Sequence, residues 1–457
     1  MSREAPFEIV VERNQAFVAR RSDGQLLGSL SRLELAVLKM LDMGNTLFEA
    51  KSAFDEVLPR ASGGLIERIE MRFKALLGRG ISVPMSLAEV SSLTPSDPKS
   101  SLRDLPGPRV LHWHVTRYCP RKCVYCYAEP LHGGRATDAS ISRERLAAIF
   151  SEASTLGAEH LVIAGSEPLL REDLPEVMGD AIAAGITPFL TTKHPIGREL
   201  AGRLAKAGVR HVSLSLDTAS AEDSVTMIGS RSYPNQVRGS MEYLAGAGVA
   251  FSIQAVATSL NITHLDDVAR MAAEAGALVM QVVPFETVRK PIANYSNSVL
   301  QLPDAVELRK TVEILADAYP SVRFEVFEKL GTGARAQFHC DIGMTKLFFL
   351  PNGVTHRCYK LVDDLGLVGK DLNTCSVAEA WHDPAFGMHI SPPRELYPAA
   401  TCAKCGRFDG CHSEGRCIYH SSVTNGTYYD QDRTCGGPYP ADAGSQLVQL
   451  EAIHMAH

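Results

Sequence analysis

Three cysteines within eight residues form the most chemically informative segment of this chain. Cys119, Cys123 and Cys126 follow the spacing C-x3-C-x2-C, so three soft ligands share one short loop. A closed structural zinc site normally has four protein ligands, and a [4Fe–4S] cluster normally has four thiolates. Three thiolates can instead hold a cubane that leaves one iron open to a small molecule. The alternative is a zinc knuckle that lacks one ligand.

The distribution of the other cysteines favours metal binding over disulfides. The chain has 457 residues and eleven cysteines; the first 118 residues contain none, and eight lie between Cys340 and Cys435. Clusters of this kind in a long intracellular chain are typical of metal ligands. The N-terminus lacks the apolar region of a signal peptide, and no apolar run reaches the ~18–20 residues of a membrane span. We therefore expect a cytoplasmic protein with reduced thiols.

The charge balance gives no indication of a nucleic-acid or membrane surface. The chain carries 46 basic and 52 acidic residues, for a net charge of −6. Neither an anionic membrane nor a nucleic acid would be attracted strongly to such a surface. Hydrophobic residues make up 45 % of the chain, which is enough for full cores, and the length predicts about three domains.

Residues 109–330 alternate apolar strands with amphipathic helices, and this pattern predicts a parallel α/β sheet. We expect strands at 110–115, 161–164, 187–191, 211–216, 251–257 and 278–283, and helices near 141–156, 173–184, 197–207, 235–247 and 264–275. The cysteine loop follows the first of these strands. Functional residues in such sheets gather at the carboxyl ends of the strands.

The cysteine loop closely resembles that of the radical S-adenosylmethionine (SAM) enzymes. The resemblance implies an open, TIM-like partial (β/α)6 barrel with the loop after its first strand. It also implies that the open iron of a [4Fe–4S] cluster binds the amino and carboxylate groups of SAM. In that family, one electron from the cluster cleaves SAM to a 5′-deoxyadenosyl radical, which removes a hydrogen atom from the substrate.

Two further segments resemble parts of the SAM site of that family. Tyr125 directly precedes the third cysteine, as an aromatic residue does in the family, where it packs against the adenine. Gly165-Ser166-Glu167 followed by Pro168 resembles the family's Gly-Gly-Glu-Pro motif, with serine in place of the second glycine. The resemblance implies that Glu167 and neighbouring backbone hold the methionine ammonium, a charge-assisted contact. The alternative is an ordinary turn leading into a helix.

Polar residues at later strand ends complete the predicted site. The resemblance implies roles for Thr192 after the third strand, and for Ser215 and Asp217 after the fourth, in binding the carboxylate and ribose of SAM. Ser215 and Asp217 are the candidates for the ribose. Relatives often carry an arginine about ten residues later, and Arg231 is the substitute here. Helix caps or ordinary strand-end polar groups are the alternative interpretation.

The late cysteines resemble the SPASM extension of peptide-modifying radical SAM enzymes. Gly353 and Cys358 form G-x4-C, and a run of C-x2-C-x5-C-x5-C is followed by one last cysteine; the family has x3 before the fourth cysteine of that run. The resemblance implies two auxiliary [4Fe–4S] clusters. The distal cluster would be bound by Cys402, Cys405, Cys411 and Cys435, and the nearer one by Cys340, Cys358 and Cys417.

The resemblance does not assign a fourth ligand to the nearer cluster. Cys375 is one candidate, and an open iron that binds substrate is the other. A zinc ribbon would also use a C-x2-C pair with further cysteines, and zinc would make the region purely structural. The auxiliary clusters themselves have a structural alternative, in which they shape the substrate pocket without carrying electrons.

Residues 1–86 resemble the PQQ peptide-chaperone family, also called the RiPP recognition element. We expect strands at 7–12 and 15–20, a turn at 24–28, a capping box at Ser31 and Glu34, helices beginning near 31, 45 and 64, and a short extended segment at 81–83. The resemblance implies a winged-helix-like unit to which a leader peptide adds as a strand. A packing or DNA-binding winged helix is the alternative.

These interpretations together predict five segments. They are a peptide-recognition domain at 1–86, a linker at 87–108, a radical SAM barrel at 109–330, a SPASM-type domain at 331–445 and a tail at 446–457. The predicted function is radical modification of a ribosomally made precursor peptide, with a carbon–carbon or thioether cross-link as product. The implied partners are that precursor and an electron donor such as flavodoxin or ferredoxin.

One residue bears on the type of modification. Sulfatase-maturing relatives place an aspartate base directly after the G-x4-C cysteine, and this chain has Tyr359 there. The difference argues against formylglycine formation. Tyr359 is a candidate acid or base, and a core tyrosine is the alternative. We expect the isolated histidines, such as His112 and His114, to be packed or solvated and not catalytic. Two rival functions remain, a radical SAM dehydrogenase or epimerase acting on a small molecule and a non-catalytic metal-binding protein.

Overall fold

The computed structural model describes the barrel and parts of the regions on either side of it. The described residues are 7–12, 15–20, 26–30, 105–126, 140–285, 302–326, 340, 342–384, 386, 392–406, 408, 411, 416–431 and 435. They contain all of the predicted cluster and SAM-site residues.

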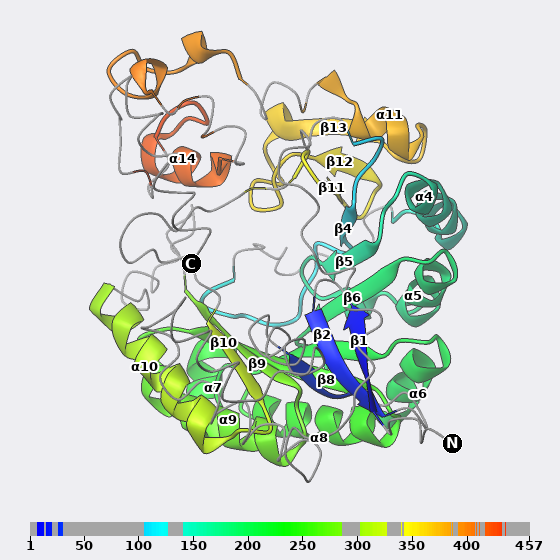
Figure 1. The fold of residues 1–457 in the computed structure, drawn as a ribbon, viewed down its shortest axis with the longest axis vertical. Coiled ribbons are helices and arrows are strands. Elements are labelled where there is room, and N and C mark those ends of the chain that lie inside the picture. The colour runs from blue at the N-terminus through cyan, green and yellow to red at the C-terminus, as the bar shows by residue number, and fades with distance from the viewer. Residues whose placement is uncertain are drawn as a thin grey trace, which may run out of the picture.

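A curved ten-stranded sheet forms the centre of the molecule (Figure 1). Its strand order is β10-β9-β8-β7-β6-β5-β4-β11-β12-β13, and every pair from β10 to β11 is parallel. The strands from the expected barrel are β4 (Val110–His114), β5 (His160–Ala164), β6 (Thr187–Thr192), β7 (His211–Ser215), β8 (Ala250–Ala257) and β9 (Val279–Pro284). All six strands expected from the sequence are therefore present, within one residue at each end, and the α/β partial barrel is confirmed.

Helices cover the outer face of this sheet, as Figure 1 shows. They are α4 (Arg143–Thr155), α5 (Leu174–Ala183), α6 (Arg198–Lys206), α7 (Ala221–Ile228), α8 (Tyr233–Gly246), α9 (Leu265–Glu274) and α10 (Leu302–Ala318). Alternation along β4 assigns its side chains to two faces. Leu111 and Trp113 are fully buried in the same apolar cluster as Phe150 of α4. His112 and His114 therefore point to the concave face of the sheet.

Local sequence signals explain where the helices begin. In α4, the Ser142 side chain accepts a hydrogen bond from the backbone N–H of Arg145, which is an ordinary N-cap. The buried residues of α4 follow the helical spacing expected of an amphipathic helix: Leu146, Ile149, Phe150 and Ala153. Of the helices that cover the sheet, two were not expected from the sequence, α7 and α10. α7 is short, and it is important because the cysteine loop packs on its end.

The sheet continues across the domain boundary expected at residue 330. β10 (Arg323–Val326) extends it at one edge, and β11 (Lys346–Phe349) pairs in parallel with β4 at the other. β12 (Val354–His356) and β13 (Val368–Asp371) then add in antiparallel order, followed by α11 (Val377–Trp381) and α14 (Ile418–Asn425). The region of the late cysteines thus begins as an extension of the barrel sheet.

The N-terminal region contributes a separate three-stranded antiparallel sheet. β1 (Phe7–Glu12) and β2 (Gln15–Arg20) match the expected strands, and they pair in antiparallel order. The expectation of a turn at 24–28 is wrong in part, because β3 (Leu26–Leu30) pairs with β2 there. Gly28 lies within that strand, so glycine alone was a misleading turn signal. The capping box, the three expected helices and the segment 81–83 lie outside the described residues.

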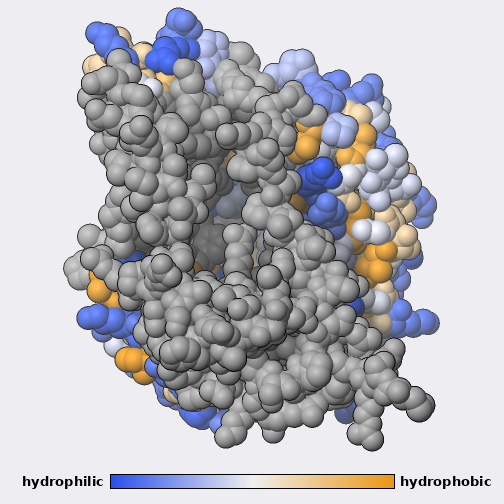
Figure 2. Space-filling view, in the orientation of Figure 1, coloured by the Kyte–Doolittle hydropathy of each residue, from blue (hydrophilic) through white to orange (hydrophobic). Residues whose placement is uncertain are grey.

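The surface over α4 and α5 is mixed in hydropathy. Figure 2 shows hydrophilic and hydrophobic residues interspersed over the flank formed by α4 and α5. Within the residues that the structure describes, every helix is too short or too polar to cross a bilayer.

Candidate active site

The cysteine loop follows β4 and is attached to the end of α7 by backbone hydrogen bonds. The N–H of Lys122 donates to the carbonyl of Ile228 at 3.2 Å, and the N–H of Val124 donates to Met227 at 3.0 Å. Within the loop, the N–H of Cys126 donates to the carbonyl of Cys123 at 3.2 Å. The loop conformation is therefore set by main-chain contacts, which leave the thiols available as ligands.

The three thiols are close enough to influence one another. Burial raises the pKa of Cys123 to about 12 and that of Cys119 to about 11, and Cys126 acts on both. Since thiolates and not thiols bind metals, iron binding at this loop must displace protons. Among the described residues, no three His, Cys, Asp or Glu side chains lie close enough to ligate a single metal ion. A cubane is bulkier than one ion, and three soft thiols on one loop are the donor set that suits it.

The Gly165–Glu167 segment packs directly against the start of the cysteine loop. Gly165 has a φ of +99°, and a Cβ built there would lie 2.9 Å from the carbonyl oxygen of Thr116. The N–H groups of Ser166 and Glu167 donate to Thr116 and Tyr118 at 3.1 and 3.2 Å. Glycine is required at 165 for both reasons, whereas serine at 166 fits without conflict.

Glu167 presents a buried carboxylate at the base of this segment. It is 1 % exposed. It accepts hydrogen bonds from the Leu169 N–H at 3.2 Å, the Thr192 hydroxyl at 2.5 Å and the Lys193 N–H at 2.9 Å. Burial raises its pKa, although these hydrogen bonds act in the opposite direction. A carboxylate has about four acceptor sites, so one remains for a cationic ligand such as an ammonium.

Asp217 lies in a second buried polar group beside the cysteine loop. Its Oδ1 accepts from the Val256 N–H at 2.8 Å, and its Oδ2 accepts from the Tyr125 hydroxyl and from Lys193 Nζ, the latter at 2.7 Å. Tyr125 is thereby fixed by a hydrogen bond from its hydroxyl. The predicted contact of Asp217 with a ribose stays a prediction, since three protein donors already occupy this carboxylate.

The structure brings most of the predicted SAM-site residues together, but not all. Seven of them lie at the carboxyl ends of β4 to β7 or in the loops that follow: Tyr125, Gly165, Ser166, Glu167, Thr192, Ser215 and Asp217. Ser215 is buried, and its carbonyl accepts a hydrogen bond from the Tyr233 hydroxyl. Arg231 is placed differently: it is exposed and forms an ion pair with Glu222 at 2.6 Å.

Two functional candidates were missed from the sequence. Lys193 directly follows the predicted SAM-site residue Thr192, and Tyr233 lies at the start of α8; neither was predicted. Lys193 Nζ lies 5.4 Å from the ring centroid of Tyr125 and 6.0 Å from that of Tyr233. Its position immediately after β6 was the available signal, because side chains at the carboxyl ends of parallel strands meet at one edge of the sheet.

The late cysteines fall into separate groups. Cys358 interacts electrostatically with Cys340 and Cys417, and burial raises its pKa to about 12. The Arg357 guanidinium, which is 1 % exposed, donates to Cys340 Sγ at 3.2 Å. These are the three cysteines that the resemblance assigned to the nearer cluster.

The distal group is less compact among the described residues. Cys402 interacts with Cys435, and Tyr397 interacts with both Cys402 and Cys411. Cys375 lies elsewhere: it packs against the barrel core, and its carbonyl accepts from Arg145 at 2.7 Å. Its strongest electrostatic partners are Glu379, Lys370 and Asp371 and not another cysteine. Its role as a fourth ligand stays a prediction, and its surroundings do not favour it.

Tyr359, the candidate acid or base, faces the histidines of the first strand. Its ring centroid lies 5.3 Å from that of His112 and 6.4 Å from that of His114. His114 is 4 % exposed, and burial lowers its pKa to about 3, so its imidazole is neutral. The two histidines are packed, as expected, but the side chains that pack on them include this tyrosine.

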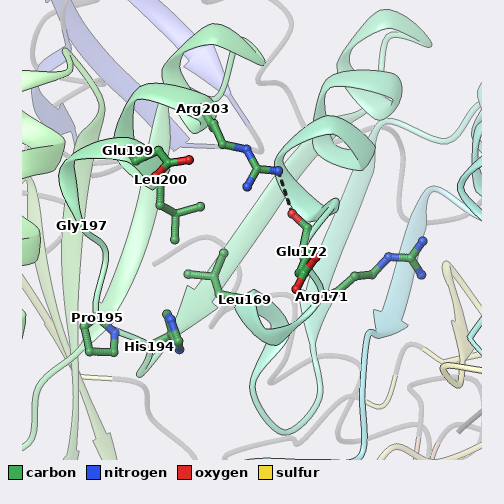
Figure 3. A pocket seen from close by; sticks show the side chains of 9 residues that line it. All are labelled: Leu169, Arg171, Glu172, His194, Pro195, Gly197, Glu199, Leu200 and Arg203. Carbon is green, nitrogen blue, oxygen red and sulfur yellow. Dashed lines mark hydrogen bonds between the residues drawn. The ribbon is translucent and has the colours of Figure 1, made fainter. Parts of the chain in front are cut away.

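A pocket of about 420 Å³ lies on the helix side of the loop after β6. Figure 3 shows Leu169, His194 and Leu200 converging on it, with Arg203 of α6 donating to the carbonyl of Glu172 at 2.7 Å. His194 follows Lys193 directly, so this pocket and the buried polar group share one loop.

Comparison with known proteins gives this geometry a family context. Residues 113–272 match the Radical SAM superfamily. The chain is 27 % identical over 350 residues to the mycofactocin maturase MftC of Mycobacterium ulcerans (strain Agy99), covering 75 % of this chain and 91 % of that protein. It is 25 % identical over 309 residues to the PqqA peptide cyclase of Methylocella silvestris, covering 66 % of this chain and 81 % of that protein.

A solved structure has the same fold along nearly the whole chain. SuiB of Streptococcus suis bound to S-adenosylmethionine aligns with a TM-score of 0.58 at 18 % identity, covering 95 % of this chain and 100 % of that one. SuiB bound to the precursor peptide SuiA aligns with a TM-score of 0.58 at 16 % identity and the same coverage. Residues 113–272 are therefore a radical SAM domain, and this domain and the maturase relatives support an enzyme function.

Proposed function

We propose that this radical SAM enzyme is a peptide maturase that modifies a ribosomally made precursor. The observation that carries the proposal is the three-thiol loop joined to the buried Glu167 segment at one end of the parallel sheet. Relatives support the substrate class, because they are a mycofactocin maturase and a peptide cyclase, and a structure of the same fold was solved with a precursor peptide.

The residues at this end of the sheet suit a cluster and SAM. Cys119, Cys123 and Cys126 would hold the first [4Fe–4S] cluster, and Glu167 would accept the ammonium of SAM through its remaining acceptor site. When bound, the first cluster and SAM supply hydrogen-atom abstraction, and auxiliary clusters supply an acceptor for the second electron. The chain's own contribution is to fix the cysteine loop and to keep this edge of the sheet dry.

The late cysteines would hold two auxiliary clusters, as the SPASM resemblance implies. The mutual proximity of Cys340, Cys358 and Cys417 supports the nearer one. Cys402, Cys405, Cys411 and Cys435 would hold the distal one. The buried Arg357 beside Cys340 would add a charge-assisted contact to a thiolate ligand. Tyr359 follows Cys358 directly, and its ring lies 5.3 Å from that of His112; it would be the candidate acid or base.

The N-terminal sheet is the proposed leader-binding unit. β1 and β3 form its two edges, and an extended peptide can add to such an edge through main-chain hydrogen bonds. The precursor would be bound there by its leader while its core enters the barrel. The product bond would be a carbon–carbon or thioether cross-link, and a flavodoxin or ferredoxin would supply electrons in the cytoplasm.

Anaerobic reconstitution tests the proposal in two stages. Full-length protein with iron, sulfide, dithionite and SAM is expected to release 5′-deoxyadenosine. Candidate precursors, encoded as short reading frames beside the gene, are then expected to bind the full chain in calorimetry and to lose two hydrogens on turnover. SAM cleavage without binding of any such peptide would favour the small-molecule dehydrogenase or epimerase. Intact clusters without 5′-deoxyadenosine would contradict the enzyme function.

A further inference from the structure

Lys193 places a buried ammonium beside the cysteine loop. Its side chain is 16 % exposed, and its Nζ lies 2.7 Å from Oδ2 of Asp217, which is wholly buried. Its Nζ is within cation–π range of the rings of Tyr125 and Tyr233, at 5.4 and 6.0 Å from their centroids.

The ammonium acts on a predicted cluster ligand. Lys193 and Asp217 are both close enough to Cys123 to act on it electrostatically, and the cation favours the thiolate whereas the anion disfavours it. The 2.7 Å contact between Lys193 Nζ and the buried Asp217 carboxylate favours the charged form of both groups. Lys193 is therefore a fixed positive charge beside the cysteine loop.

A buried charge next to a redox centre changes how easily that centre accepts an electron. Reduction adds negative charge to the cluster, so a nearby cation stabilises the reduced form and a nearby anion destabilises it. The effect is large where water is excluded and small for exposed charges screened by salt. Tyr125 lies between Cys123 and Cys126 in the sequence, and its hydroxyl is bonded to Asp217, so the ion pair and the loop are one connected unit.

We propose that Lys193 is a positioning residue whose charge, held in place by Asp217, raises the reduction potential of the SAM-binding cluster. This inference rests on the proposed function, because it assumes a cluster at Cys119, Cys123 and Cys126. It gives the Lys193–Asp217 pair a role in the environment of the cluster, beside the ribose contact predicted for Asp217.

The sign of the change distinguishes this role from a structural one. Lys193→Met removes the cation and leaves the anion, so the potential is expected to fall. Asp217→Asn removes the anion and leaves the cation, so the potential is expected to rise. The double variant restores a neutral pair, and its potential is expected to return toward that of the wild type. A merely structural role would shift both single variants in the same direction or in neither.

The experiment is an EPR-monitored redox titration of reconstituted full-length protein. The cluster is identified by the change in its signal on adding SAM, and by its loss when Cys119, Cys123 and Cys126 are all replaced by alanine. We expect each single variant to shift the equilibrium constant for reduction at least tenfold, or 59 mV for one electron. Lys193→Arg keeps the charge and is expected to stay near the wild type, as is the exposed control Lys206→Met.

The outcomes separate this inference from the proposed function. Opposite shifts in the two single variants, with recovery in the double variant, support it. Shifts in the same direction, or shifts below tenfold in a cluster that still releases 5′-deoxyadenosine, overturn it and leave the proposed function intact. A protein without iron at the three cysteines overturns both. If Lys193→Met fails to assemble the cluster, Asp217→Asn and the double variant provide the test. The reduction potential is then expected to rise in Asp217→Asn and to return toward the wild-type value in the double variant.

Discussion

The two cysteine-bearing regions of this molecule are built in opposite ways. The first three cysteines lie on one loop, whose shape is fixed by main-chain hydrogen bonds to α7 and to the Gly165–Glu167 segment. The cysteines assigned to the nearer auxiliary cluster are far apart in the sequence, at 340, 358 and 417, and Cys358 interacts electrostatically with the other two. The first site is thus formed by one short loop that the barrel supports. The second site forms only when the C-terminal region has folded.

This difference has a physical consequence for metal binding. The cysteine loop is held by contacts that need no metal, so it is preorganised for a cluster. Cys358 and Cys417 lie in one small apolar cluster with Leu361, Leu367, Ile418 and Tyr419, and metal binding there would add to the folding free energy of this region.

Replacing Cys119, Cys123 and Cys126 together by alanine is expected to abolish 5′-deoxyadenosine release, because every ligand of the first cluster is lost. The fold is expected to persist, since the loop is attached through its backbone. Product analysis by chromatography and circular dichroism give the two readouts. SAM cleavage at the wild-type rate in this variant would refute the assignment of the site.

Replacing Cys358 by alanine is expected to remove the nearer auxiliary cluster and to lower iron by about four atoms per chain. Peptide product is expected to be lost while uncoupled SAM cleavage continues, because the first cluster is retained. Cys375→Ala is the matched control, since Cys375 lies apart from the other cysteines. A loss of iron in the control as large as in Cys358→Ala would instead establish Cys375 as the fourth ligand.

Replacing Glu167 by glutamine is expected to weaken SAM binding by about 1.5–3 kcal/mol, or roughly 10- to 150-fold, the usual contribution of a hydrogen bond to a charged group. Glutamine keeps the size of the side chain but removes the negative charge and offers one acceptor oxygen in place of two. Equilibrium binding of SAM to the oxidised, reconstituted protein measures the effect. Unchanged affinity with an intact cluster would show that Glu167 does not contact the ammonium.

Replacing Gly165 by alanine is expected to lower the free energy of unfolding by about 1–3 kcal/mol, the usual cost of a strained backbone conformation. The φ of +99° disfavours a side chain, and the new Cβ would lie 2.9 Å from the Thr116 carbonyl. Ser166→Gly is the control and restores the family's second glycine. Denaturant unfolding compares the three proteins, and equal stability of Gly165→Ala and wild type would contradict the close approach of these two loops.

The sequence predicted the local features better than the contacts between them. The six barrel strands follow from apolar runs and the SAM-site loops from short motifs, because both depend on neighbouring residues. The Lys193–Asp217 pair depends on two strand ends meeting, and no spacing in the sequence encodes it. Arg231 was chosen by its distance from Asp217 along the chain, but α7 and the turn after it place it at the surface. β3 was missed because Gly24 and Gly28 resemble a turn.

The central claim is that the three-cysteine loop holds a cubane whose fourth iron is free to bind SAM. Electron–nuclear double resonance of the reduced, reconstituted chain tests it directly, with SAM labelled by 15N in its amino group and 17O in its carboxylate. The account predicts hyperfine coupling of both labels to the cluster, lost on replacing the three cysteines. An intact, reduced cluster at this loop that shows coupling to neither label would contradict it.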